Sequence, residues 1–306
     1  MLNISGFRHP SIGEIVTGDV FFLDANATNT NDDPGNGKDP RKPFSTIDYA
    51  FSKMTSNNDD ALYVMAGHSE TVTGAGGFTQ DVSGCKIIGL GIYDRRPNIL
   101  MDGSAITGLL TAANYRMENM VFSAGHADIA NCFLVTGKGA HLKNLSFEQN
   151  TATENWVNAI DVGAADNDSD GLVIEGCNFN MPDGAEVTAI DVLMTTRDIK
   201  IIDNRIQGDF DASPYAAIYS VNTKHHYNCE IARNHIHNAH DGNAAIAISF
   251  GSTTSTGFMY DNLASGNEAG SSTPFVSAAA GLQLANNLYS GDDSTSAYVL
   301  PAIGAN

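Results

Sequence analysis

The chain carries the phrase IIDNRI at residues 201–206, and related phrases recur as IARNHI at 231–236, MYDNLA at 259–264 and LANNLY at 284–289. Each phrase begins with an apolar residue and ends five positions later with a second apolar or aromatic one. Four earlier copies keep this outer pair, at Ile87–Ile92, Met117–Phe122, Leu142–Phe147 and Ile174–Phe179. The copies begin 25 to 32 residues apart, which indicates a repeat architecture with loops of variable length.

Asparagine occupies the fourth place of the last four copies, at Asn204, Asn234, Asn262 and Asn287. Asparagine tolerates the left-handed backbone conformation of a bend, so we expect these residues to adopt it. We also expect each side-chain amide to hydrogen-bond the equivalent amide one repeat away. Earlier copies carry apolar residues or cysteine at this place, so the column is predicted to point into the interior as a structural ladder.

A second strand-like phrase keeps step with the first and has its isoleucines at Ile160, Ile190, Ile218 and Ile246. Each repeat therefore contains at least two short strands separated by Gly, Asn and Asp turns. Short strands at this spacing predict an all-β fold, a single-stranded parallel β-helix (solenoid) of about eight to ten coils.

The composition excludes several classes of function. A net charge of −19 with only 16 scattered Lys and Arg residues argues against a nucleic-acid partner. Neither a signal peptide nor a membrane-spanning stretch is found, so no membrane partner is expected and folding is predicted to occur in a reducing cytoplasm. The four cysteines are far apart and without CxxC spacing, and we expect them to be small core side chains.

Three regions are predicted along the chain. Residues 1–20 form an N-terminal docking arm, because leaving Phe7, Ile12 and neighbouring apolar residues in water is costly; its candidate docking residues are Phe7, Arg8, His9, Pro10 and Ile12. Residues 21–60 contain a strand, a polar loop and a short amphipathic helix capped by Ser45 or Thr46, which closes the open end of the coil. Residues 61–306 form the β-helix.

The N-terminal third also resembles a known family. A strand, an Asn/Asp/Gly loop, a helix and a second strand carry the pattern at Phe22, Asp24, Gly37, Pro40, Pro43, Phe44, Thr46, Ile47, Ala50, Val64 and Gly67. This order is similar to the N-terminal cap of right-handed parallel β-helices of the pectin-lyase-like superfamily. Residues 67–91 are similar to β-helix proteins of tailed bacteriophages. The resemblance implies a right-handed coil and a virion protein.

Two groups of aspartates are candidates for chemistry. Asp161 and Asp191 follow equivalent isoleucines, so they should stack on adjacent coils with their side chains outward, as a catalytic carboxylate pair or, more simply, a solvated acidic stripe. Asp166, Asp168 and Asp170 alternate through one loop and are candidate Ca²⁺ ligands, although the twelve-residue calcium-loop pattern is incomplete. We therefore assign no catalytic residue, metal or cofactor.

Phrases that carry catalysis in pectate lyases and polygalacturonases are not matched here. We therefore expect a non-enzymatic structural component of a phage particle, a head decoration or head-fibre protein anchored by its arm. Its expected partners are other virion proteins, first the major capsid protein, and further copies of itself as a trimer. The expected location is the virion, assembled in the host cytoplasm.

Two alternative functions remain. One is a tailspike-like polysaccharide depolymerase, either a polysaccharide lyase or a glycoside hydrolase. The other is a tail protein that binds a surface glycan through Trp156, Tyr219 and Tyr227, whose rings could stack on sugars.

Overall fold

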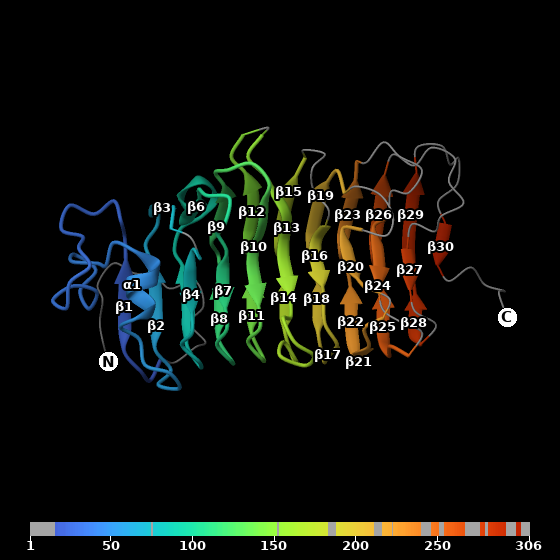
Figure 1. Ribbon diagram of the computed structural model, residues 1–306, viewed down its shortest axis with the longest axis horizontal. Helices are drawn as coiled ribbons and strands as arrows, with labels where there is room; N and C mark the ends of the chain where they lie inside the picture. Colours follow the sequence, from blue (N-terminus) through green and yellow to red (C-terminus); the bar gives the residue numbers. More distant parts are fainter. Residues whose placement is uncertain are drawn as a thin grey trace.

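The computed structural model describes residues 16–74, 76–151, 153–182, 188–210, 216–221, 223–239, 246–250, 254–266, 276–278, 281–291 and 298–300. Over these residues the chain winds into a right-handed parallel β-solenoid, and Figure 1 shows its coils stacked in chain order along one long axis. The predicted fold class is confirmed.

Each coil adds one strand in turn to three sheets, which we name A, B and C. Sheet A consists of β1 (Val20–Leu23), β2 (Ala61–Val64), β5 (Lys86–Gly89), β8 (Arg116–Glu118), β11 (His141–Lys143), β14 (Val173–Glu175), β18 (Lys200–Ile202), β22 (Cys229–Ala232), β25 (Gly257–Tyr260) and β28 (Leu282–Ala285). Sheet B consists of β3 (Ser69–Val72), β6 (Asn98–Met101), β9 (Val121–Ala124), β12 (Ser146–Gln149), β15 (Asn178–Met181), β19 (Arg205–Gly208), β23 (His235–Asn238), β26 (Leu263–Gly266), β29 (Asn287–Gly291) and the antiparallel β30 (Tyr298–Leu300).

Sheet C consists of β4 (Phe78–Gln80), β7 (Gly108–Leu110), β10 (Ile129–Val135), β13 (Trp156–Val162), β16 (Thr188–Val192), β20 (Ile218–Ser220), β24 (Ile248–Phe250) and β27 (Val276–Ala278). A small two-stranded sheet pairs β17 (Thr196–Arg197) with β21 (His226–Tyr227). A 3₁₀ turn, η1 (Tyr93–Arg95), lies between β5 and β6.

The repeated phrase forms the end of a sheet A strand, the corner that follows it and the start of the next sheet B strand. In the six copies that begin at Met117 to Met259, the first residue is buried in sheet A and the last is buried in sheet B, as for Leu142 and Phe147. The first copy departs from this pattern, because Ile92 lies on the surface beside η1. Ile99 takes the inner place instead, in register with Phe122.

The second phrase forms sheet C, with one correction to its last copy. Ile190 and Ile218 lie side by side in register as expected, but the next member of the column is Ile248. Ile246 instead packs with Tyr219 in a separate small cluster. The sequence AIAI at 245–248 fits the phrase in two registers, and the pairing of β20 with β24 selects the later one.

Aromatic rings fill the core of the early coils. Phe133 meets Phe122 and Phe147 edge-on, at ring-centre distances of 4.6 and 5.4 Å. Phe147 and Phe179 stack nearly parallel at 4.8 Å. Edge-to-face and offset contacts at these separations are favourable beyond the area they bury, so this aromatic column holds successive coils in register. All four cysteines are buried, as predicted.

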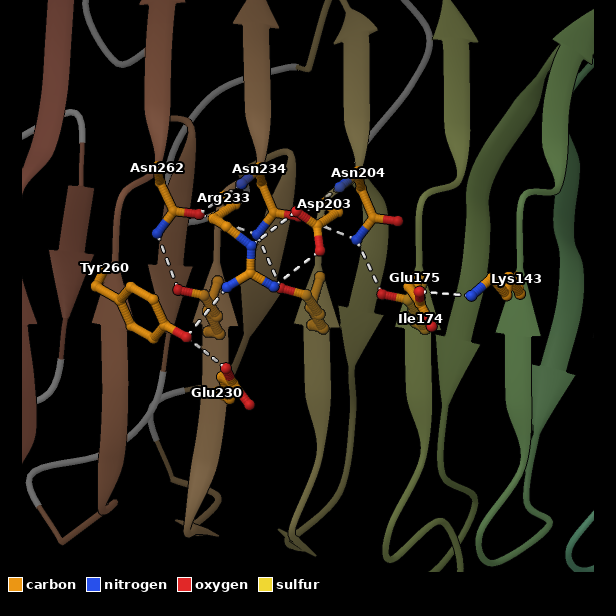
Figure 2. Close-up of polar contacts among 12 residues, drawn as sticks. Lys143, Ile174, Glu175, Asp203, Asn204, Glu230, Arg233, Asn234, Tyr260 and Asn262 are labelled. Carbon is orange, nitrogen blue, oxygen red and sulfur yellow. Dashed lines mark hydrogen bonds and ion pairs between the residues drawn. The ribbon is translucent and has the colours of Figure 1, made fainter.

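The asparagine column continues the interior where the aromatic column ends. Asn204, Asn234 and Asn262 each donate through Nδ2 to Oδ1 of the next asparagine, at 3.0, 3.0 and 2.8 Å, and the last acceptor is Asn287. Each Nδ2 also donates to a carbonyl of the preceding coil, as Asn204 does to Ile174 (Figure 2). The expected amide-to-amide bonds are therefore present, and all four side chains are buried.

The left-handed conformation at this corner belongs to a different residue from the one expected. It falls one position earlier, on the residue before the ladder place, in seven successive corners: Asn119, Asn144, Gly176, Asp203, Arg233, Asp261 and Asn286. The preceding residue makes the turn, which leaves the ladder asparagine free to direct its side chain inward.

A short helix, α1 (Ile47–Phe51), closes the N-terminal end of the core, as the sequence predicts. Thr46 is the N-cap, and its hydroxyl accepts from Tyr49 N. The buried Glu70 carboxylate accepts from Ile47 N at 3.0 Å, so a negative charge lies at the positive end of the helix. Ile47, Ala50 and Phe51 face the core.

The parallel sheet begins earlier than residue 61. β1 pairs in register with β2, which makes Val20–Leu23 the first strand of sheet A. Thr17 N donates to the Asp59 carboxylate and Asp19 N to that of Asp60. The chain is therefore attached to the rod from Thr17 onward, inside the segment predicted as an arm.

Candidate functional site

Two aspartates stack on the outer side of sheet C. Asp161 in β13 and Asp191 in β16 are register partners, as predicted, and each lies between residues that face the core. The two side chains are only 8 % and 5 % exposed. The expectation of a solvated acidic stripe is therefore wrong, because these carboxyl groups are almost wholly withdrawn from water.

Asp161 is held by two asparagines that the sequence did not single out. Asn131 Nδ2, one coil earlier, and Asn158 Nδ2, in the same strand, each donate to one Asp161 oxygen at 2.9 Å. Burial raises the pKa of Asp161, and the two amide donors partly oppose that rise. The donors favour the charged form, so Asp161 is the member of the pair better able to carry the negative charge.

Asp191 lies in a less favourable environment for a charge. Burial, together with the neighbouring Asp161 carboxylate, raises its pKa to about 7. Its Oδ1 is buried without a hydrogen-bond donor. Two carboxyl groups on adjacent strands, with neither base nor cation between them in the described chain, share one negative charge more readily than two.

Burial disfavours ionisation of both carboxyl groups. The effect is greater for Asp191, which lacks the two amide donors of Asp161 and lies beside the Asp161 carboxylate. Strand spacing puts the two backbones about 4.8 Å apart. The low exposure of both carboxyl groups restricts access to them.

Comparison with known proteins supports the fold of this chain but assigns no function to it. No protein-family model matches the chain, and no curated protein sequence matches it. A solved rhamnogalacturonan lyase is similar, with 13 % identity, a TM-score of 0.45, and 88 % of this chain and 87 % of that chain covered. The crystal structure of pectate lyase Pel9A is also similar, with 11 % identity, a TM-score of 0.49, and 89 % and 80 % covered. These matches concern the parallel β-helix alone.

The aspartates of the 163–170 loop do not converge on one point. Asp166 accepts from Lys224 Nζ, Asp168 from Ala164 N and Ala165 N, and Asp170 from Arg197 N. Each carboxylate therefore ties a turn or a neighbouring coil. Among the described residues, no group of three or more acidic, His or Cys side chains is placed to hold a metal ion.

Two of the three aromatic residues proposed as sugar platforms are buried. Trp156 is fully buried and Tyr219 nearly so. The Tyr227 ring is covered by the Arg197 guanidinium at 4.8 Å. The burial of Trp156 and Tyr219 contradicts their use as sugar platforms, whereas Tyr227 is half-buried.

His226 is a polar residue of the core. Its ring nitrogens contact the hydroxyls of Thr196 and Ser220 at 2.9 and 2.8 Å, and burial lowers its pKa to about 4. The candidate docking residues Phe7, Arg8, His9, Pro10 and Ile12 lie outside the described residues. In the described chain, no helix is long and apolar enough to cross a membrane.

Replacing Asp191 by asparagine should change how stability depends on pH. The folded-state pKa of Asp191 is raised from 3.8 to about 7, so its contribution favours the fold below pH 4 and is lost as pH rises through 7. Asp191→Asn should therefore exceed the wild type in free energy of unfolding by on the order of 4 kcal/mol above pH 8 and match it near pH 3. Urea unfolding across this range measures the difference, with the exposed Asp94→Asn as control. A constant gap at all pH values would contradict the assignment.

Proposed function

We propose that this chain is a non-enzymatic structural component of a phage particle, a head decoration or head-fibre protein held by its N-terminal segment. The observation that carries the proposal is the position of the attachment at residues 17–19. Thr17 and Asp19 are fixed to the loop at Asp59 and Asp60, at the end of the rod that α1 closes. A segment preceding Thr17 therefore joins the rod at that end, where an anchor would leave the long faces free.

The polar contacts of the rod support a static role. Arg233 forms a two-pronged ion pair with Asp203 of the preceding coil and also contacts the Tyr260 hydroxyl, which donates to Glu230 (Figure 2). Lys143 and Lys200 pair with glutamates of the following coils in the same way. Such contacts between coils hold long surface side chains in fixed positions, which is consistent with a structural role.

The test is imaging of the parent particle with and without residues 1–15 of this protein, a deletion that ends before the bonds of Thr17. We expect a rod or knob at regular positions on the head to disappear while the purified variant remains folded by circular dichroism. Retention of the variant on the head would show that these residues are not the anchor. Loss of density from the tail tip alone, with failed adsorption, would assign the protein to a tail fibre.

The Asp161–Asp191 pair favours a second candidate, a polysaccharide depolymerase in which Asp191 is the acid and Asp161 the base. It is second because both carboxyl groups are nearly closed to solvent. Incubation with capsular and uronate polysaccharides, followed by assay of reducing or unsaturated ends, tests it. Activity that is lost in Asp161→Asn and Asp191→Asn, but kept in Asp166→Asn, would establish it. An inactive wild type would exclude these substrates.

A further inference from the structure

The corner between sheets A and B carries an exposed apolar turn near the N-terminal end of the rod. Residues 91–96 are inserted between β5 and β6 and displace two large side chains from the core. Ile92 is 70 % exposed and Tyr93 is 86 % exposed. Tyr93 also has a φ of 52°, an uncommon conformation for an aromatic residue. We name Ile92, Tyr93 and Arg95 the apolar corner turn.

The same corner carries a second apolar surface near the other end. Phe258 in β25 is 57 % exposed, and Leu263 in β26 and Leu288 in β29, which are register partners, are each 43 % exposed. These three side chains flank the ladder residues Asn262 and Asn287. We name them, with the corner residue Asp261, the terminal patch. Exposed apolar side chains that lie together on a surface can mark a site of association.

Among the described residues, neither Arg95 in the first surface nor Asp261 in the second forms an ion pair within the chain. The Arg95 guanidinium donates to the Ala66 carbonyl, and the described residues offer it no carboxylate. Asp261, exposed at its corner, has no basic partner among the described residues. This contrasts with Asp203 and Arg233 at neighbouring corners, which pair with each other. A partner that brings an arginine to Asp261 and a carboxylate to Arg95 would satisfy both.

We infer that two copies of this chain associate antiparallel along the A–B corner, the apolar corner turn of each lying on the terminal patch of the other. Both surfaces lie on one edge of the rod at opposite ends. A two-fold axis perpendicular to the rod therefore makes both contacts at once and closes the assembly. Arg95 of each copy then meets Asp261 of the other.

The position of that axis coincides with a glycine. Between the turn before β6 and the patch at β26, the strand order β6-β9-β12-β15-β19-β23-β26 places the corner before β15 at the middle, and this corner is Gly176. Its left-handed conformation is adopted elsewhere by Asn, Asp and Arg, so the turn itself does not require glycine. A Cβ there would meet nothing within 4 Å of its own chain. The missing side chain leaves room at the axis itself, in the middle of a contact about 30 Å long.

This pairing does not depend on the proposed function, and it differs from the trimer expected from the sequence, so the state of association tests both. Sedimentation equilibrium of the purified full chain should give a dimer. Tyr93→Ser, Asp261→Arg and Arg95→Asp should each weaken it at least tenfold, whereas combining Arg95→Asp with Asp261→Arg should restore it. Lys42→Asp, a charge reversal on an exposed loop residue, should leave it unchanged. A monomer or a trimer at all concentrations, or a double variant weaker than either single variant, would overturn the inference.

Cysteine pairing tests the direction. The native cysteines are buried, so they do not compete with introduced ones. A mixture of Tyr93→Cys and Leu263→Cys chains should form a disulfide between the two kinds of chain, and neither variant alone should form one. Disulfides within Tyr93→Cys alone would show parallel association and reject the antiparallel pair. Circular dichroism of each variant confirms that it is folded.

Discussion

Asn234→Ala is expected to lower the free energy of unfolding by about 4 kcal/mol, since it leaves several buried polar groups without partners at about 1–3 kcal/mol each. Asn234 Oδ1 accepts from both the backbone N and Nδ2 of Asn204. Its own Nδ2 donates to the Ile201 carbonyl and to Asn262 Oδ1. Alanine removes all four bonds, and water has no access to replace them.

Asn234→Asp sharpens this test because it keeps the shape and the acceptor but removes the donor. It places a carboxylate oxygen against the Ile201 carbonyl and Asn262 Oδ1, so it should be no more stable than Asn234→Ala at pH 7 and should recover partly in acid. Gln207→Ala, on the exposed face of the adjoining strand, is the control and should change stability by less than about 0.5 kcal/mol. Denaturant unfolding measures all three. An Asn234→Ala loss below 1 kcal/mol would show that the ladder does not hold these coils.

Phe133→Ala is expected to cost about 3–5 kcal/mol, the range for truncating a large buried aromatic side chain. Phe133 fills the space beside Gly108, where an added Cβ would lie 2.8 Å from its ring. It also meets the edges or faces of Phe122 and Phe147. Alanine would therefore leave a cavity spanning three coils that the stiff sheets cannot close.

Phe133→Leu is the matched variant and should lose less than half as much, since leucine keeps most of the apolar volume. Thermal and urea unfolding should both show the order wild type, leucine, alanine. Equal losses for leucine and alanine would mean that ring contacts, rather than volume, carry the stability of this column.

The coil itself could be predicted because its signal is repeated. Each copy of the phrase shows an apolar residue entering sheet A and another entering sheet B, so one irregular member such as Ile92 does not hide the rest. The ladder was visible for the same reason, since four asparagines at one place require a common cause. The N-cap at Thr46 was recognisable because its signal is local.

The candidate site depended on information that no local pattern contains. Asp161 owes its environment to Asn131, thirty residues earlier, which becomes its neighbour only once the coils are in register. The solvent exposure of an outward-facing carboxylate depends on which segments pack over that face of the sheet. The alternation of residues along a strand gives no information about this packing. The left-handed residue was misplaced by one position because Asn and Asp occupy both places in several corners.

Because the three sheets keep one register, the length of this rod can change only by whole coils. A segment such as 204–233 begins and ends at equivalent points of the coil, so a duplication or loss of one such segment changes the rod by one step of about 4.8 Å and leaves both extremities as they were. The length of such a molecule can therefore change in evolution by the gain or loss of whole coils. Its reach can be matched to the spacing of whatever surface it contacts, one coil at a time, without redesign of the sites at its ends.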